Sequence, residues 1–89
     1  MKISLIFACY NISKYLDELY QLLISQTYKD VEIIFVEDCS IDDTRNKLLT
    51  LDDPRVKVIL NEKNIGAANS RNRGIEEATG DYIWFPDPD

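Results

Sequence analysis

Four apolar segments alternate with stretches of helical periodicity along the whole chain, and this alternation constrains the fold most. The apolar segments cover residues 3–8, 31–36, 56–60 and 82–85. Nearly continuous apolar runs rich in β-branched residues are typical of strands covered on both faces, as in parallel sheets. Parallel strands joined through helices require right-handed crossovers. The pattern therefore predicts an α/β fold: a Rossmann-like three-layer α/β/α domain with a four-stranded parallel sheet in the order 3-2-1-4.

Three helices are expected between these strands. Apolar residues recur at helical spacing after the first strand, with Ser13 as the N-cap. Residues 40–43 read Ser-Ile-Asp-Asp, the form of a capping box, which predicts a helix that runs to about Leu51. A third helix is predicted over residues 67–78, closed by Gly80 in the left-handed conformation.

Composition limits the class of protein. The 89 residues suit one small domain, and 16 acidic against 10 basic residues give a net charge of -6. Such a chain is expected to repel nucleic acids and anionic membrane surfaces. The chain contains no apolar run of the roughly 20 residues that span a bilayer. We therefore expect a cytoplasmic protein, with peripheral membrane association left open for a full-length enzyme.

Cysteine and histidine usage narrows the chemistry. The two cysteines, Cys9 and Cys39, are too few for a disulfide framework, so we expect reduced thiols. The absence of histidine excludes His-based triads and most zinc sites.

Two carboxylates, Asp87 and Asp89, follow the last predicted strand. Open α/β sheets bind ligands at the carboxyl ends of their strands, and hard oxygen donors there suit a divalent cation that carries a diphosphate. With three glycines the chain has no glycine-rich phosphate loop, so a metal would have to neutralise the phosphates. Taken alone, an Asp-x-Asp sequence is more often a solvated turn than a metal-binding site.

Three further side chains belong to the same predicted edge, and the first two have a plainer alternative. Tyr10 is placed to stack on a nucleobase, or is a partly buried aromatic at a strand end. Asp38 is placed to accept from a base or a ribose hydroxyl, or to cap a helix. Arg71 and Arg73 diverge by about 200° on a helix, so one of them faces the site. We assign Arg71, because it shares a stripe with Gly74, which allows close approach to the sheet. That stripe consists of Ala67, Arg71, Gly74, Ile75 and Ala78.

The chain resembles the N-terminal, nucleotide-sugar-binding half of family-2 glycosyltransferases with the glycosyltransferase-A-type fold. The resemblance implies that Tyr10 and Asp38 contact uracil and its ribose and that Arg71 lies near the nucleotide. It also implies that Asp87 and Asp89 hold Mn²⁺ or Mg²⁺ against the diphosphate. The stretches that carry it are residues 4–11, 26–44, 64–75 and 78–89.

The same resemblance implies an inverting enzyme that transfers a sugar from a UDP-sugar to a hydroxyl of a carbohydrate or lipid-linked acceptor, in polysaccharide or glycoconjugate biosynthesis. Residues 1–89 would form the donor subdomain, truncated at the Asp-x-Asp, with the acceptor half and the catalytic base absent. No residue of this chain is a credible base, and the isolated chain is expected to be inactive. The alternatives are a non-catalytic nucleotide-binding module and an excised folding unit. The cut edge beside the last strand is expected to promote self-association.

The chain departs from the family pattern at three places. The usual Pro-Thr-Tyr-Asn reads Ala-Cys-Tyr-Asn at residues 8–11. The usual Asp-Asp-Gly-Ser reads Glu-Asp-Cys-Ser at residues 37–40, so Cys39 stands where glycine is expected. Pro88 lies between the two acids and restricts Asp87 to extended conformations.

Overall fold

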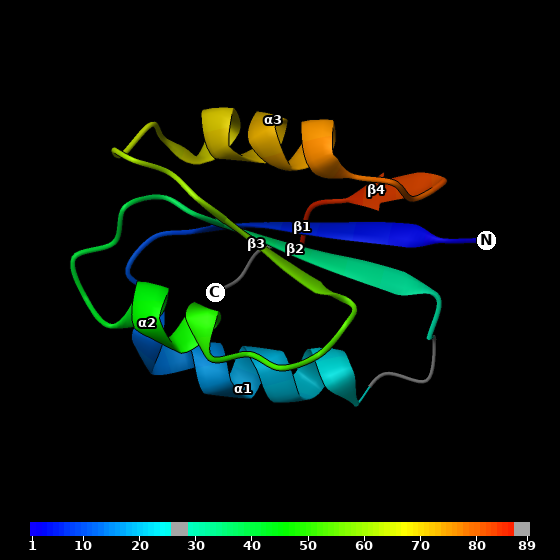
Figure 1. Ribbon diagram of the computed structural model, residues 1–89, viewed down its shortest axis with the longest axis horizontal. Helices are drawn as coiled ribbons and strands as arrows, with labels where there is room; N and C mark the ends of the chain where they lie inside the picture. Colours follow the sequence, from blue (N-terminus) through cyan, green and yellow to red (C-terminus); the bar gives the residue numbers. More distant parts are fainter. Residues whose placement is uncertain (26–28, 87–89) are drawn as a thin grey trace.

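The computed structural model describes residues 1–25 and 29–86 of the chain and contains the alternating strands and helices that the sequence predicts (Figure 1). The elements, in chain order, are β1 (Ile3–Cys9), α1 (Ser13–Ile24), β2 (Val31–Glu37), α2 (Thr44–Leu49), β3 (Val56–Leu60), α3 (Ala67–Glu77) and β4 (Tyr82–Trp84).

The strands form one four-stranded sheet in the order β3-β2-β1-β4, with every neighbouring pair parallel. In the central pair, β1 and β2 are in register from Ile3 opposite Val31 to Cys9 opposite Glu37. β4 pairs with β1 over three residues and forms one edge of the sheet. The predicted fold class and strand order are confirmed.

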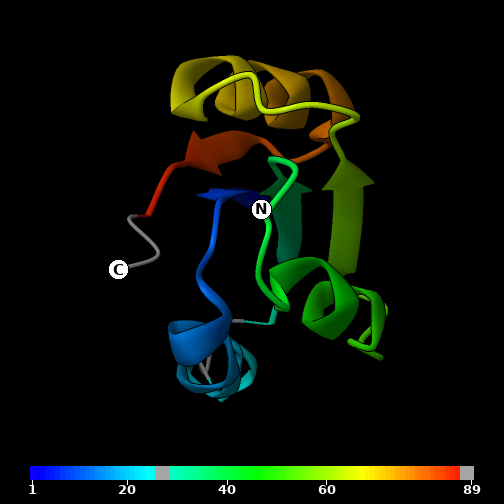
Figure 2. The ribbon, with the colours of Figure 1, turned by 90° about the vertical axis from the view of Figure 1, so that its left-hand side faces the viewer.

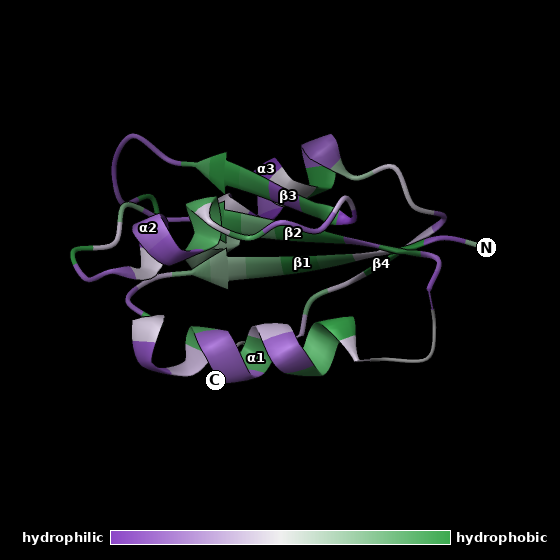
Figure 3. Cartoon of the chain, turned by 60° about the horizontal axis from the view of Figure 1, so that its bottom comes forward, coloured by the Kyte–Doolittle hydropathy of each residue, from purple (hydrophilic) through white to green (hydrophobic). Residues whose placement is uncertain are grey.

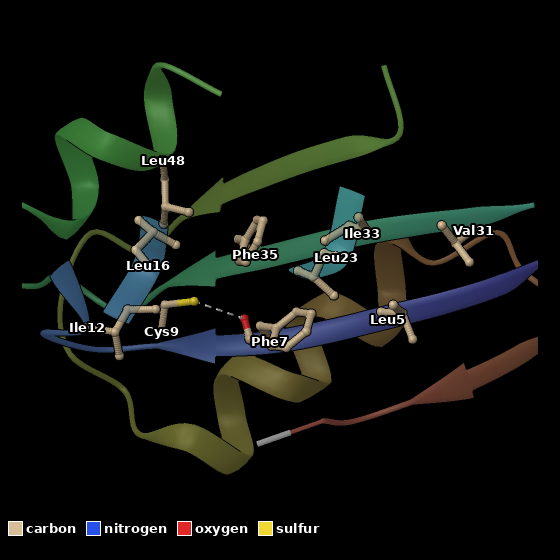
Figure 4. Packing of buried hydrophobic residues seen from close by; sticks show 10 residues of the cluster. All are labelled: Leu5, Phe7, Cys9, Ile12, Leu16, Leu23, Val31, Ile33, Phe35 and Leu48. Carbon is tan, nitrogen blue, oxygen red and sulfur yellow. Dashed lines mark hydrogen bonds between the residues drawn. The ribbon is translucent and has the colours of Figure 1, made fainter. Parts of the chain in front are cut away.

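Helices cover both faces of the sheet. Figures 1 and 2 show α3 on one side and α1 with α2 on the other. The larger core lies between the sheet and α1 and α2, where the rings of Phe7 and Phe35 stack with their centroids 5.3 Å apart (Figure 4). The smaller core beneath α3 consists of Ile6, Ile34 and Val36, with Ile59 and Ala78 packed against it. The central strands are therefore buried on both faces, as their apolar sequences require.

Gly74 allows α3 to approach the sheet closely, as predicted. It is buried, and a Cβ at this position would overlap the Ile6 side chain and lie 3.4 Å from a methyl group of Val36. Gly80, in contrast, does not adopt the predicted left-handed conformation. A Cβ on Gly80 would lie 2.5 Å from Ser4 Oγ, so glycine is required there by close contact with β1.

The predicted helix caps are wrong. Neither α1 nor α2 has a side-chain cap hydrogen bond from its own N-cap residue, which is Ile12 for α1 and Asp43 for α2. Ser13 is instead the first helical residue of α1, and α2 ends at Leu49 rather than near Leu51.

The groups that cap α1 come from the first residue of α2 and from the loop just before it. Thr44 Oγ1 accepts a hydrogen bond from the amide of Ile12 at 2.9 Å, and Asp42 Oδ2 accepts one from the amide of Ser13 at 3.2 Å. The hydroxyl of Ser40 accepts from the amide of Asn11 at 3.0 Å. The polar residues of the expected capping box therefore join the loop after β2 to the loop after β1.

β4 leaves apolar side chains exposed at the edge of the sheet. Tyr82, Ile83, Trp84 and Phe85 are between 41% and 62% exposed. Figure 3 shows that the strands are predominantly hydrophobic, whereas the helices combine hydrophilic and hydrophobic residues. Among the residues that the structure describes, no helix has the length and apolar character needed to cross a membrane.

Candidate functional site

The loops that follow β1, β2 and β3 lie at the same end of the molecule (Figure 1). Two backbone hydrogen bonds continue the sheet into this edge. The amide of Asp38 donates to the carbonyl of Cys9, and the amide of Asn61 donates to the carbonyl of Glu37, each at 2.9 Å. Tyr10, Asp38 and Asn61 consequently emerge from three adjacent strands at the ligand-binding edge of an open α/β sheet.

Asp38 lies at the centre of this edge, and its carboxylate is buried. Its side chain is 3% exposed. Oδ1 accepts hydrogen bonds from the side-chain amide of Asn61 at 2.9 Å and from the backbone amide of Ile65 at 2.8 Å, and Oδ2 accepts from the backbone amide of Gly66 at 3.0 Å. The carboxylate therefore holds the loop between β3 and α3.

Asn61 is a second buried polar residue at the edge, and it was not predicted from the sequence. It is 1% exposed. Its Nδ2 also donates to Ser70 Oγ at 3.0 Å, and its Oδ1 accepts from Arg73 Nη1 at 2.5 Å. The available sequence signal was a polar residue placed directly after a strand, the same signal that identified Asp38.

Tyr10 is accessible at this edge, and Arg71 is accessible on α3. Tyr10 is 46% exposed, and Arg71 is exposed on α3. The predicted stripe of α3 is confirmed at Gly74, which is buried, and at Ala78, which packs against the smaller core. It is wrong at the other three positions, which are exposed, and it omitted the buried Ser70. Arg73 turns toward the end of β3, where it also donates to the carbonyl of Leu60 at 3.4 Å. The role of Arg71 at a nucleotide stays a prediction.

Two non-glycine residues at the edge adopt left-handed backbone conformations. Asn11 has φ of 55° and Cys39 has φ of 59°. Asn11 uses its side chain in this position, since its Oδ1 accepts from the amide of Ile41 at 2.9 Å. The Sγ of Cys39 donates to the carbonyl of Glu62 at 3.7 Å. The left-handed backbone explains why glycine is expected at position 39.

Replacing Cys39 by glycine is expected to raise the free energy of unfolding by about 1 kcal/mol. A side chain in the left-handed region costs about 1–2 kcal/mol, and the greater freedom of glycine in the unfolded chain offsets part of the gain. Urea unfolding of the Cys39→Gly variant checks this. Cys39→Ala serves as the control, because it removes the thiol and keeps the Cβ. Equal stability of the two variants would show that the backbone at position 39 is not strained.

Cys9 is buried between the sheet and the helices, next to the acidic side chain of Glu37. Burial, together with the nearby Glu37 carboxylate, raises the pKa of the Cys9 thiol from 9.0 to about 12. Cys9 and Cys39 are both free cysteines in the structure. Glu37 is fully buried and accepts a hydrogen bond from the amide of Ser40 at 2.7 Å, while its Oε2 has no partner among the described residues.

The proposed metal ligands, Asp87 and Asp89, lie outside the described residues. Within residues 1–25 and 29–86, no three histidine, cysteine, aspartate or glutamate side chains gather closely enough to hold a metal ion. The case for a metal therefore rests on the chemistry of the two terminal carboxylates, whose hard oxygen atoms are the donors that Mg²⁺ and Mn²⁺ prefer.

A hollow of about 460 Å³ adjoins the buried network at the end of β3. It is lined by Leu60, Asn61, Glu62, Lys63, Ile65 and Arg73. A larger hollow of about 640 Å³ lies along the outer face of α1 and is lined by Asp17, Glu18, Gln21, Leu22 and Ser25. We place the candidate site at the strand ends, because buried polar groups from several elements converge there. The described lining of the α1 hollow comes from α1 and the residue after it, so no such convergence is seen in that hollow.

A parallel α/β sheet with polar groups gathered at its carboxyl edge defines the class of open-sheet domains that bind ligands at this edge. The sequence profile of Glycosyl transferase family 2 matches residues 4–89. The chain belongs to this family.

Two bacterial relatives illustrate the similarity. Glycosyltransferase GlyG of Streptococcus pneumoniae serotype 4 is 39% identical over 89 residues, which are 98% of this chain and 30% of that protein. The UDP-Glc:alpha-D-GlcNAc-diphosphoundecaprenol beta-1,3-glucosyltransferase WfaP of Escherichia coli is 39% identical over 87 residues, with 98% and 35% covered. The chain thus spans about a third of the length of these curated relatives.

Solved structures agree with the fold. The crystal structure of Staphylococcus aureus TarS 1–349 in complex with UDP-GlcNAc aligns with a TM-score of 0.91 and 33% identity, covering 100% of this chain and 27% of that one. The mannosyltransferase PcManGT of Pyrobaculum calidifontis aligns with a TM-score of 0.88 over 99% of this chain and 27% of that one. At 23% identity, PcManGT supports the fold alone.

Proposed function

We propose that the chain is the donor-binding part of an inverting glycosyltransferase that transfers a sugar from a UDP-sugar to an acceptor hydroxyl. The observation that carries the proposal is the alignment of the whole chain, at 33% identity, with a structure that holds UDP-GlcNAc. The acceptor is a lipid-linked or free saccharide, as the diphosphoundecaprenol in the name of the WfaP relative suggests. The enzyme acts on the cytoplasmic side of the membrane, and the 89-residue chain alone is inactive.

Each residue of the proposed site has a chemical role. Tyr10 stacks on the uracil, and Asp38 accepts from the base or the ribose. Arg71 neutralises part of the diphosphate charge. Asp87 and Asp89 hold Mn²⁺ or Mg²⁺, which stabilises the negative charge on the departing diphosphate when it is bound. The base that deprotonates the acceptor hydroxyl is supplied by residues other than these.

The test is a titration of the chain with UDP, followed by NMR, with and without Mn²⁺. We expect UDP to bind weakly and more tightly with the metal, and Asp38→Ala to abolish saturable binding, because Asp38 holds the β3–α3 loop. Glu77→Ala, an exposed change on α3, is the matched control. Binding that is indifferent to both Mn²⁺ and Asp38→Ala would exclude the proposal. Saturable binding by a natural protein that transfers no sugar would favour the non-catalytic alternative.

The exposed edge of β4 is also expected to promote self-association. Trp84 is 62% exposed on a strand with one neighbour, and such edges recruit further strands. Sedimentation velocity is expected to show larger species as concentration rises, and Trp84→Lys is expected to remove them. Leu22→Lys on α1, where Leu22 is 67% exposed, is the control. A wild-type chain that stays monomeric at all concentrations would contradict this expectation.

A further inference from the structure

We propose that Asn61 is a positioning residue of the nucleotide site, whose side-chain amide couples the Arg73 guanidinium to the Asp38 carboxylate. The inference rests on the function proposed above and names the group that prepares the edge for a nucleotide. Its first support is burial, because a polar side chain that is 1% exposed and makes three side-chain hydrogen bonds is held in one orientation.

The chemistry of the two neighbours determines which residue type fits between them. The Asp38 carboxylate only accepts hydrogen bonds, and the Arg73 guanidinium only donates them. A side chain that bridges them needs a donor at one end and an acceptor at the other. The amide of Asn61 provides both, with Nδ2 at 2.9 Å from Asp38 Oδ1 and Oδ1 at 2.5 Å from Arg73 Nη1. The two neighbours therefore also fix which way the amide points.

The bridge leaves one oxygen of Asp38 with spare capacity. A carboxylate has about four acceptor positions, two on each oxygen. Oδ1 is saturated by Asn61 and the Ile65 amide, whereas Oδ2 accepts one hydrogen bond, from the Gly66 amide. Without Asn61, the carboxylate would be held by the amides of Ile65 and Gly66 and by one hydrogen bond fewer, so its orientation would be less tightly fixed. Among the described residues, Oδ2 therefore keeps one acceptor position that no protein donor fills.

The same bridge sets the start of α3. Gly66 is the N-cap of this helix and has φ of 89°, and its amide is held by Asp38 Oδ2 at 3.0 Å. The side-chain amide of Asn64 donates to the carbonyl of Asp38 at 3.1 Å. Arg71 lies on the helix that begins here, so the orientation of the Asp38 carboxylate influences where the Arg71 side chain stands.

The test replaces Asn61 by aspartate. A neutral carboxyl group at position 61 reproduces the amide, because it can donate to Asp38 and accept from Arg73. An ionised carboxylate cannot donate to Asp38. At pH 7.5, Asn61→Asp places an ionised carboxylate next to that of Asp38, and the two repel each other. UDP affinity is expected to fall about tenfold or more, which corresponds to ~1.4 kcal/mol. The hydrogen-exchange protection of the Ile65 and Gly66 amides is expected to fall with it. Both are expected to recover toward pH 5 as the pair takes up a proton. The charged side chains that line the hollow beside position 61 are Glu62, Lys63 and Arg73.

Gln21→Glu, an exposed change on α1 with the same change in charge, is the control and is expected to leave affinity and protection unchanged. Arg73→Met tests the other end of the bridge at an exposed residue, and it is expected to reduce both the UDP affinity and the protection of the Ile65 amide. Wild-type affinity and protection in Asn61→Asp at pH 7.5, a loss that pH does not reverse, or an unaffected Arg73→Met would each overturn the inference. Wild-type protein that binds no UDP would instead refute the proposed function, and the protection of the two amides would still decide the role of Asn61.

Discussion

Replacing Glu32 by glutamine is expected to lower the free energy of unfolding by about 3 kcal/mol at pH 7. Glu32 lies on β2, is 3% exposed, and is the buried acid on which several parts of the chain converge. Its Oε2 accepts hydrogen bonds from the amide and hydroxyl of Thr79 at 2.8 and 2.6 Å and from Ser4 Oγ at 3.1 Å. Its Oε1 lies 3.1 Å from Lys57 Nζ.

The magnitude follows from the pKa of the Glu32 carboxyl. Burial alone would raise this pKa, but the hydrogen bonds from Thr79, Lys57 and Ser4 outweigh it and lower the pKa from 4.5 to about 2. That lowering corresponds to about 3 kcal/mol of stability. Because the folded pKa lies below the unfolded one, this contribution is fully present above pH 4.5 and is lost as the pH falls toward 2.

Urea unfolding of the wild type and of Glu32→Gln over a range of pH checks the prediction. The two stabilities are expected to differ by about 3 kcal/mol at pH 7 and to converge as the pH falls through 2, where the carboxyl takes up its proton in the folded state. Glu18→Gln, on the exposed face of α1, should follow the wild type throughout. A constant difference between wild type and Glu32→Gln at every pH would mean that the ionised carboxylate is not the stabilising species.

Replacing Gly74 by valine is expected to cost about 3 kcal/mol of stability. A Cβ at position 74 overlaps the Ile6 side chain, and overpacking of this kind costs about 1–3 kcal/mol. The branched side chain of valine adds further contact with the sheet. The better helix propensity of a non-glycine residue returns less than 1 kcal/mol. The exposed change Glu76→Val on the same helix should cost no more than about 1 kcal/mol.

A double-mutant cycle identifies the cause of this loss. Gly74→Ala is expected to cost less in an Ile6→Ala background, because the methyl group that the new Cβ would meet is then absent. Strictly additive effects of the two substitutions would show that contact with Ile6 is not the cause of the loss.

The strands and their order were predictable, because the hydrophobic pattern of the sequence indicates them. The runs that became β1 and β2 are buried on both faces, and such strands carry a clear sequence signal. The starts of α1 and α2 were not predictable, because the groups that cap α1 belong to Asp42 and Thr44, which lie about 30 residues further along the chain. Local capping rules do not include partners this distant in sequence.

The candidate site was predictable in position and less so in detail. The strand-end rule correctly indicated the edge that carries Tyr10 and Asp38. The burial of Asp38 was not foreseen, since two of its partners are the backbone amides of Ile65 and Gly66, which any residue except proline supplies. Asn61 was missed for a related reason, because its role depends on Arg73 and Asp38 meeting in space.

The measurement that tests the central claim most directly is paramagnetic broadening of the backbone amide signals by Mn²⁺ in the presence of UDP. If a cation-bridged nucleotide binds at the carboxyl edge, the amides of Tyr10, Cys39 and Gly66 should broaden, and those of Thr79 and Gly80 near the opposite ends of the strands should not. UDP should be required for the full effect. Broadening concentrated at Gln21 and Leu22 in the α1 hollow, or unchanged by UDP, would contradict the account.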